Sequence, residues 1–386
     1  MKKILIISGN NHTFTSGADM YTSRIISILK KQGCSIDEYS FEINISNKDN
    51  NKEKKVRIIS PNKTFNDCNG SKLKWLIKNI YNVVYRSRRQ LDKLIKDYDL
   101  IIDASLLLVR SKKLLNSDKY LYIQHQNIDF FEMKRYGILT PIAFFLIRAA
   151  GFKNCFKMAK NIVFYDEKNK KYIEDKYKFK DHSKYFTIIN SNLTRKTIEK
   201  NKKIKENVYK TNEFYNDINY IGRITKEQKR MNDVDKIFRR TNTKLDAYGF
   251  GTYASKLSNN PNINYHGKIE HKDVLSTNSH SKFSLLFSDY EGLSTSMVES
   301  ICSLTPIIIR DSHHSAKFLV DNNKNGFLLK NKSSIREYAK IIDEINELPM
   351  EKLKELSDNC YKFAIENLLF ETFEKKWIDV YHEMTK

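Results

Sequence analysis

The chain has 386 residues, of which 40% are hydrophobic and 30% are charged, with 68 Lys and Arg against 46 Asp and Glu. This length allows one or two domains with cores of their own, and the ordinary hydrophobic share excludes a wholly disordered chain. The formal net charge of +22 predicts an anionic partner, which could be nucleic acid, a membrane, an acidic polymer or a phosphate-bearing substrate.

The charge excess lies entirely in the first half of the chain. Residues 1–210 hold 43 Lys and Arg and 21 Asp and Glu, which leaves 25 of each sign for residues 211–386 out of the totals of 68 and 46. We therefore expect two domains that meet different partners.

Cysteine usage and hydropathy indicate a cytoplasmic protein. The five cysteines are scattered and form no C-x-x-C pair, which argues against a disulfide framework or a zinc site. The opening apolar run, Ile4–Ile7, has only four residues and predicts a buried strand rather than a signal peptide. The longest later apolar stretch, 138–150, is interrupted and too short to span a bilayer.

Short apolar strands alternate with helices from the beginning of the chain. A helix is expected from Ser16 to Gly33 and a long one over Leu73–Lys96, with a polar loop over Asn44–Lys55. The strands are expected at Lys3–Ser8, Ser35–Phe41, Leu100–Ala104, Tyr120–Gln124 and Asn161–Phe164. This alternation predicts a parallel sheet covered by helices on both faces.

The pattern pauses over Asn190–Lys210, which is rich in Asn and Lys, and then restarts. Strands are expected at Ile218–Gly222, Lys244–Tyr248, Ile263–His266, Phe283–Phe287 and Pro306–Ile309. We predict two α/β domains, residues 1–205 and 206–365, and a C-terminal helix, residues 366–386, that crosses back onto the first domain.

The strongest local signal is the run Ser288–Ser300. Glu291 and Glu299 are eight residues apart where a strand passes into a helix, and Gly292 allows a tight turn between them. A helix that begins at the carboxyl end of a parallel strand is a typical anion site. The alternative is an ordinary capped helix with two solvated carboxylates, to which this run alone gives about equal weight.

Cations and glycines follow the other strands of the second half. Arg223 and Lys229 come directly after a strand and suit phosphate oxygens, although a solvated basic loop would look the same. Gly249, in a G-x-G turn, and Gly267 each end a further strand at the same edge of the sheet. A G-x-G turn alone is weak evidence for ligand binding.

Taken together, the order and spacing of these elements over 218–329 resemble the donor-binding half of the retaining nucleotide-sugar glycosyltransferases of family 4. That family has the GT-B fold, which implies two Rossmann-like parallel-sheet domains facing a central cleft. The matching elements are Gly-Arg with a following Lys, the G-x-G turn, Asn-Ile-x-x-x-Gly, the Glu pair and Thr-Pro-Ile-Ile.

The resemblance implies a role for each matching residue. Arg223 and Lys229 would neutralise the nucleotide diphosphate, Glu299 would bind the ribose, and Glu291 would contact the donor sugar. Backbone groups of His266, Gly267 and Lys268 would bind the base edge. At the helix start, which follows the donor-binding Gly292, the amides of Leu293, Ser294 and Thr295 would add hydrogen-bond donors. The chain departs from the commoner family pattern at Leu293–Thr295, where many members have a second glycine, and these positions lie beside the sugar.

In the first domain, Gly17 resembles the family's glycine turn and His125 its cleft histidine. A helix start and a structural histidine are the alternatives. Because no D-x-D motif stands beside the donor elements, we expect neither a metal nor another cofactor. Asp311, His313 and His314 lie on one loop and make a poor metal cage.

Two basic segments with interleaved apolar residues, 72–96 and 133–160, could rest on an anionic membrane. For either segment alone a buried apolar face with solvated cations is favoured, but the charge excess of the first half favours an anionic surface or acceptor. We expect an enzyme at the inner face of the plasma membrane that moves a sugar, with UDP-sugars favoured as donors, to a glycan or lipid-linked acceptor of the cell envelope. The alternatives are a protein or small-molecule acceptor, a non-catalytic GT-B subunit, or a nucleic-acid binder, for which no recognised module is visible. The oligomeric state stays open.

Overall fold

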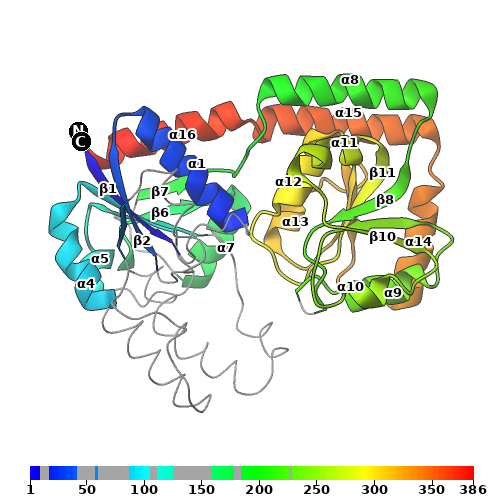
Figure 1. The fold of residues 1–386 in the computed structure, drawn as a ribbon, viewed down its shortest axis with the longest axis horizontal. Helices are drawn as coiled ribbons and strands as arrows, with labels where there is room; N and C mark the ends of the chain where they lie inside the picture. Colours follow the sequence, from blue (N-terminus) through cyan, green and yellow to red (C-terminus); the bar gives the residue numbers. More distant parts are fainter. Residues whose placement is uncertain are drawn as a thin grey trace, which may run out of the picture. The chain divides into compact units, whose positions relative to one another are not determined.

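The computed structural model describes residues 1–8, 17–40, 57–59, 87–104, 111–124, 158–177, 184–226 and 228–386 (Figure 1). These residues divide into two compact units. The first takes the described residues up to Ile188 together with Glu374–Lys386, and the second takes Ile189–Phe373. Among the described residues, no helix is both long and apolar enough to cross a membrane.

The first unit is built on a parallel sheet. Within the described residues it has seven strands in the order β3-β2-β1-β4-β5-β6-β7. They are β1 (Lys3–Ser8), β2 (Ser35–Ser40), β3 (Arg57–Ile59), β4 (Leu100–Asp103), β5 (Tyr120–Ile123), β6 (Asn161–Phe164) and β7 (Lys184–Thr187). The central strands β4, β5 and β6 are buried along their whole length, as expected for a sheet covered on both faces.

The described helices of the first unit follow the predicted pattern. They are α1 (Gly17–Lys31), α4 (Ser87–Leu94) with the 3-10 turn η3 (Ile95–Asp97), α5 (Lys112–Leu115) and α7 (Glu167–Tyr177). The chain leaves α1 through Gly33 at a φ of +74°, a conformation that glycine adopts at little cost. Most of the predicted helix over 73–96 lies outside the described residues, and α4 with η3 is its described end.

The second unit contains a six-stranded parallel sheet in the order β10-β9-β8-β11-β12-β13. Its strands are β8 (Asn216–Ile221), β9 (Leu245–Tyr248), β10 (Ile263–Gly267), β11 (Ser281–Leu286), β12 (Ile307–Arg310) and β13 (Gly326–Leu329). The chain order runs outward in one direction from β8 to β10 and in the other from β11 to β13. The sheet therefore has a topological switch point between β8 and β11, where open α/β sheets bind ligands at the carboxyl ends of the strands.

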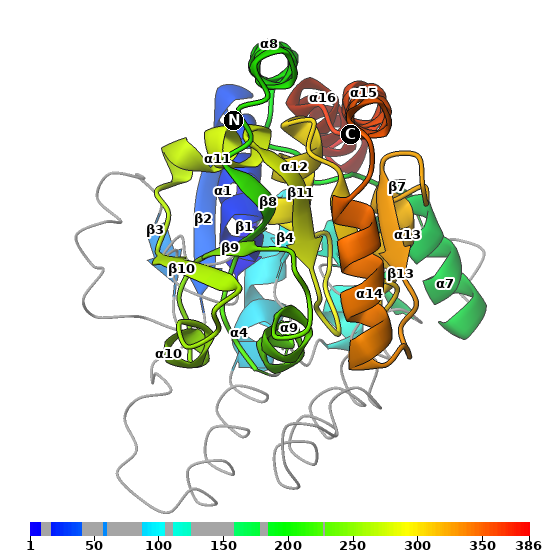
Figure 2. The ribbon, with the colours of Figure 1, turned by 90° about the vertical axis from the view of Figure 1, so that its right-hand side faces the viewer.

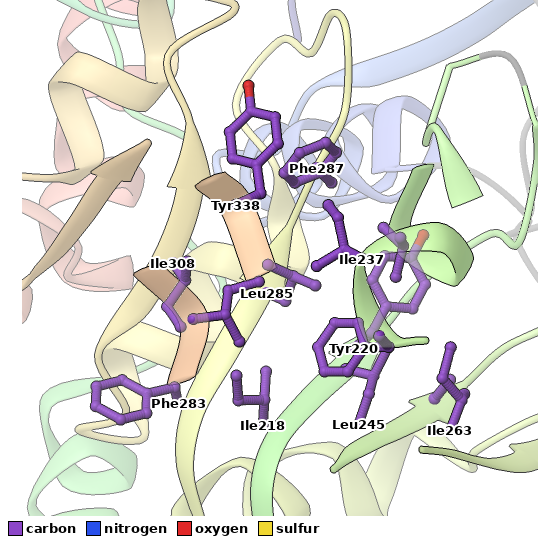
Figure 3. Packing of buried hydrophobic residues seen from close by; sticks show 14 of the residues in the cluster. Ile218, Tyr220, Ile237, Leu245, Ile263, Phe283, Leu285, Phe287, Ile308 and Tyr338 are labelled. Atoms are coloured by element: carbon purple, nitrogen blue, oxygen red, sulfur yellow. The ribbon is translucent and has the colours of Figure 1, made fainter. Parts of the chain in front are cut away.

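Helices cover both faces of this second sheet (Figure 2). Phe283 and Leu285 of β11 point into the cluster formed with α9 (Met231–Phe238) and α14 (Ile335–Asn346), and Leu286 points into the opposite one. Figure 3 shows the first cluster, in which the Phe287 and Tyr338 rings meet edge to face at 4.9 Å between centroids. The remaining helices are α8 (Arg195–Thr211), α10 (Ala254–Leu257), η5 (His271–Asp273), α11 (Val274–Ser279), α12 (Thr295–Cys302), α13 (His314–Leu319) and α15 (Met350–Asn367).

The interpretation of 190–210 as a pause between domains is wrong, because most of this segment is the helix α8. It runs beside α15 (Figure 1), where the Tyr209 hydroxyl lies 2.6 Å from Ser357 Oγ. Its buried face has the helical spacing of Ile198, Asn201, Lys205 and Val208. Two of these four residues are polar, which is why the apolar pattern was too weak to predict a helix.

The domain boundary at 205/206 consequently falls inside a helix, and the second unit begins at Ile189 instead. The new boundary also changes how the net charge is divided between the two units. The α8 segment has seven basic and two acidic residues, a net of +5, so part of the excess assigned to the first domain belongs to the second unit.

The last helix, α16 (Phe370–Met384), belongs to the first unit from Glu374 onward. There the Trp377 ring meets Tyr21 of α1 edge to face, with 6.1 Å between centroids, and Glu374 pairs with Lys31 at 3.0 Å. The sequence placed the start of this helix at 366, but α15 continues to Asn367.

Lys205 gives α8 a pH-sensitive attachment to the second sheet. Its fully buried ammonium donates to the carbonyl of Ser281 at 2.6 Å and to Thr305 Oγ1 at 3.2 Å. Burial disfavours the charged form and lowers the pKa of Lys205 from its ordinary value of 10.5 to about 7.

We predict that Lys205→Met removes part of the pH dependence of folding. Between pH 7 and 10.5 the unfolded chain holds a proton at Lys205 that the folded chain has released, so this residue makes folding more favourable as the pH rises, by up to about 1.4 kcal/mol per pH unit. Urea unfolding of wild type and Lys205→Met at pH 8 and pH 9.5 measures the difference. Lys203→Met, on the exposed side of the same helix, is the control and should follow wild type. Parallel pH dependences in all three proteins would contradict the prediction.

Candidate functional site

Three loops meet at the carboxyl edge of the second sheet. They follow β8, β11 and β12 and comprise residues 222–230 (Glu227 lies outside the described residues), 287–294 and 311–313; we call them the switch-point loops. Ser312 Oγ donates to the carbonyl of Ser288, and the Asp289 amide donates to the carbonyl of Gln228 at 2.8 Å. The three loops therefore hold one another in place.

An ion pair between Lys229 and Glu291 lies at the centre of these loops. The Lys229 ammonium donates to Glu291 Oε1, and each side chain is only 10% exposed. Burial raises the pKa of the Glu291 carboxyl, but the charge and hydrogen bond of Lys229, together with smaller effects of His313 and Ser288, leave this pKa below its ordinary value. Glu291 is consequently a carboxylate at neutral pH, and the sequence prediction that these two residues share a site is consistent with this contact.

Arg223 is held beside this pair by Gln228. Its side chain is exposed, and Nη2 donates to Gln228 Oε1 at 2.7 Å, while Gln228 Nε2 donates to the carbonyl of Tyr290 at 3.2 Å. Sequence reasoning missed Gln228, since a single glutamine in a basic loop carries no signal. The arrangement leaves a planar guanidinium at the solvent side of the site, where it can meet an anionic ligand.

A partly buried carboxylate fixes the backbone beside Lys229. Asp289 pairs with the guanidinium groups of both Arg310, at the end of β12, and Arg230, whose Nη1 lies 3.1 Å away. Arg230 has a φ of +50°, a left-handed conformation that costs a non-glycine residue about 1 kcal/mol. Its ion pairs with Asp289 and Asp233 offset this cost.

Gly249 supports the Arg223 loop from the neighbouring strand. Its φ is +137°, and a Cβ atom there would lie 1.8 Å from the carbonyl oxygen of Gly222. A Cβ atom at Gly251 would likewise lie too close to the backbone, 2.2 Å from the carbonyl oxygen of Ile224. The G-x-G turn therefore has a packing reason that is visible in the structure, and donor binding by Gly249 stays a prediction.

The predicted base-binding segment lies at the end of β10. His266 Nε2 lies 2.6 Å from Asp246 Oδ1, and its ring stacks on Tyr248 at 4.5 Å between centroids. Gly267 has a φ of +74°, and the exposed Lys268 ammonium lies 3.9 Å from Glu270. These backbone groups stand at the same edge of the sheet as the switch-point loops.

The second predicted carboxylate, Glu299, lies in α12. It is buried and accepts from Asn192 Nδ2 at 3.2 Å, with His271 Nε2 at 3.5 Å. Ser294 is the N-cap of α12 and makes no side-chain cap bond, and Gly292, Leu293 and Thr295 complete the helix start. The helix follows the carboxyl end of β11, so its positive end lies at the edge of the sheet where the diphosphate is predicted to bind.

The structure leaves other predicted residues undecided. Gly17 begins α1, and its surroundings are not described. His125, residues 72–86 of the first basic segment and residues 133–157 of the second lie outside the described residues. The described part of the chain contains no group of three or more His, Cys, Asp or Glu that could hold a metal ion, and Asp311 forms an ion pair with Lys317 at 3.4 Å.

Comparisons with known proteins agree with this geometry. Residues 201–363, less than half of the chain, match the model of the family described as Glycosyl transferases group 1. These residues contain the second sheet and all three switch-point loops. No curated protein matches the chain.

Several solved structures share the fold over nearly the whole chain. HepE of Anabaena, solved with UDP and glucose, is 13% identical, covers 99% of this chain and 100% of its own, and has a TM-score of 0.67. WaaG, a glycosyltransferase involved in lipopolysaccharide biosynthesis, is 13% identical over 98% and 99%, with a TM-score of 0.66. Sucrose-phosphate synthase from Thermosynechococcus elongatus is 12% identical over 100% and 99%, with a TM-score of 0.72.

The two parallel sheets, each with the strand order of a Rossmann fold, and these likenesses show that the chain has the GT-B fold of nucleotide-sugar glycosyltransferases. The α/β, GT-B fold class expected from the sequence is confirmed. The finer expectation, a retaining enzyme of family 4, stays a proposal.

Gly249→Ala should destabilise the second unit far more than Gly267→Ala. Both glycines have positive φ, but a Cβ at Gly267 meets nothing within 4 Å, whereas one at Gly249 overlaps the Gly222 carbonyl. We expect a loss of more than about 3 kcal/mol for Gly249→Ala and about 1 kcal/mol for Gly267→Ala. Hydrogen exchange of the core strands β8 and β11 measures both opening free energies. Similar small losses in the two variants would show that the close approach at Gly249 does not matter.

Proposed function

We propose that the protein is a retaining glycosyltransferase that takes a sugar from a nucleotide diphosphate donor, with UDP-sugars favoured. The observation that carries this proposal is the buried Lys229–Glu291 pair, with Arg223 beside it, at the switch point of a sheet that matches the group 1 family model.

Lys229 and Arg223 supply the positive charge for the diphosphate. In the structure Lys229 is paired with Glu291, and Arg223 is bonded to the neutral Gln228. A diphosphate is a stronger partner for both cations because its charge is larger and its oxygens match the guanidinium fork. Binding of the donor therefore draws Lys229 from Glu291 to phosphate, and no metal is needed to balance the charge in this proposal.

The freed Glu291 carboxylate then faces the donor sugar and accepts hydrogen bonds from its hydroxyls. Glu299, which accepts from Asn192 in the free protein, binds the ribose hydroxyls. Backbone groups of 266–268 contact the base, and the start of α12 adds amide donors. The resemblance also assigns Gly17 to the donor and His125 to the reacting centre, and both assignments stay predictions.

The reaction proceeds on one face of the sugar. The bond between the anomeric carbon and the diphosphate oxygen breaks as the acceptor oxygen bonds to the same carbon, and the proton of the acceptor hydroxyl passes to the departing phosphate oxygen. Lys229 and Arg223 stabilise the charge that develops on that leaving group, which is where fixed cations lower a barrier most.

Two observations support the choice of donor and acceptor. HepE was solved with UDP, and WaaG takes part in lipopolysaccharide biosynthesis, and both share the fold of this chain. The net charge of +22 favours an anionic glycan or a lipid-linked acceptor at the inner face of the plasma membrane. We propose such an acceptor in place of a nucleic acid.

Replacing either member of the central pair should abolish most of the transfer activity. In a donor screen that measures nucleotide release, Glu291→Gln and Lys229→Met are expected to lose about 10²–10³ in rate, the loss typical of removing one electrostatic group from a reacting centre. Lys226→Met, an exposed cation in the same loop, is the control and should stay within about twofold of wild type.

Lys229→Met leaves Glu291 buried without its partner, so folding must be verified by thermal unfolding. Arg223→Met keeps the test decisive because Arg223 is exposed, and this variant should fold normally yet bind UDP about tenfold more weakly. Near-normal release in all three variants would refute these roles. An inverted anomeric centre in the product, measured by NMR, would refute retention alone, and stabilisation by oligonucleotides but by no nucleotide sugar would refute the enzyme class.

A further inference from the structure

His313 presents a buried ring nitrogen that the protein itself does not use. The residue follows β12 in the third switch-point loop, and its Nδ1 lies 2.8 Å from Ser315 Oγ. The other nitrogen, Nε2, is buried and has no hydrogen-bond partner among the described residues. A buried polar atom without a partner costs free energy, which indicates that something else satisfies it in the working state.

The imidazole stands next to the proposed donor site. Ser312, the preceding residue, is bonded to the carbonyl of Ser288, three residues before Glu291. The charges of Glu291, Lys229 and Arg310 all act on the ring. Burial, together with the two cations, lowers the pKa of His313 to about 4 against the opposing effect of Glu291, so the ring is neutral at physiological pH.

From this position we propose that Nε2 of His313 hydrogen-bonds a hydroxyl of the donor sugar and helps to select which sugar is transferred. The proposal rests on the proposed function, because it places the residue beside the Glu291 carboxylate that this function assigns to the sugar. From the sequence alone, His313 was considered only as one of three residues that would make a poor metal site.

The chemistry of a neutral imidazole favours a hydroxyl over a phosphate oxygen. The contact with Ser315 fixes which nitrogen is available but allows either tautomer, so Nε2 can be a donor or an acceptor. A sugar hydroxyl matches both cases because it donates and accepts, whereas a phosphate oxygen accepts only. The negative charge of a diphosphate is also already met by Lys229 and Arg223.

The test uses two substitutions, each of which keeps a polar atom at the place of only one of the two ring nitrogens. His313→Asn keeps a polar atom at the place of Nδ1, where it can still meet Ser315, and removes Nε2. His313→Gln instead carries its amide to the place of Nε2. Calorimetric titration of the full-length protein with UDP, and with whichever of UDP-glucose, UDP-galactose and UDP-N-acetylglucosamine binds wild type most tightly, compares a ligand that lacks the sugar with one that has it.

We expect His313→Asn to bind the UDP-sugar about five- to tenfold more weakly, the effect of one lost neutral hydrogen bond, and to bind UDP within twofold of wild type. His313→Gln should bind the UDP-sugar within about twofold of wild type. Equal losses for UDP and UDP-sugar in His313→Asn, or no loss for either, would overturn the proposal while leaving the proposed function intact. A wild-type protein that binds neither UDP nor any UDP-sugar would overturn the proposed function and this inference with it.

Discussion

The reversal of strand order between β8 and β11 is the constraint on which the candidate site depends. In an all-parallel sheet every strand ends at the same edge, and the two strands beside the reversal send their following loops to opposite faces, which leaves room for a ligand between them. Arg223 and Lys229 follow one of these strands and Glu291 follows the other. The close approach of Gly249 to Gly222 keeps the first loop against the sheet, and Asp289, which pairs with Arg230 and Arg310, keeps the second in register with it.

Three cations of the site form ion pairs with carboxylates of the protein. Lys229 is neutralised by Glu291, and Arg230 and Arg310 share Asp289, so the buried Lys229 and Arg310 and the partly buried Arg230 all have anionic partners. Arg230 and Arg310 keep their partner when a ligand arrives, because Asp289 holds the loops together. In the proposed reaction Lys229 alone exchanges its carboxylate partner for the diphosphate, and this exchange frees Glu291 for the sugar.

The sequence predicted much of the second sheet because its strands are short apolar runs that end in glycines or charged residues. It missed α8, whose buried face includes Asn201 and Lys205, because hydrophobic periodicity cannot detect a helix that packs through polar contacts. Arg223, Lys229 and Glu291 stand out in the sequence because they lie in loops after strands in a family-like order, and their roles stay predictions. Gln228, Asp289, Arg310 and the free nitrogen of His313 were not, since their importance arises from contacts between loops about 20 to 60 residues apart. The positive charge is also not confined to the first unit, because α8, with a net charge of +5, belongs to the second.

The central claim is that a nucleoside diphosphate binds between the loops that follow β8 and β11. Hydrogen exchange with mass spectrometry, in the presence and absence of saturating UDP, tests it most directly because it locates the ligand without requiring a known acceptor. We predict added protection in the peptides that cover 222–230 and 288–296, and unchanged exchange in α8, whose Lys205 contacts Ser281 and Thr305 at the opposite, amino ends of β11 and β12. If UDP binds but exchange in both loop peptides is unchanged, or if protection appears only in other peptides, the assignment of this edge as the donor site is contradicted.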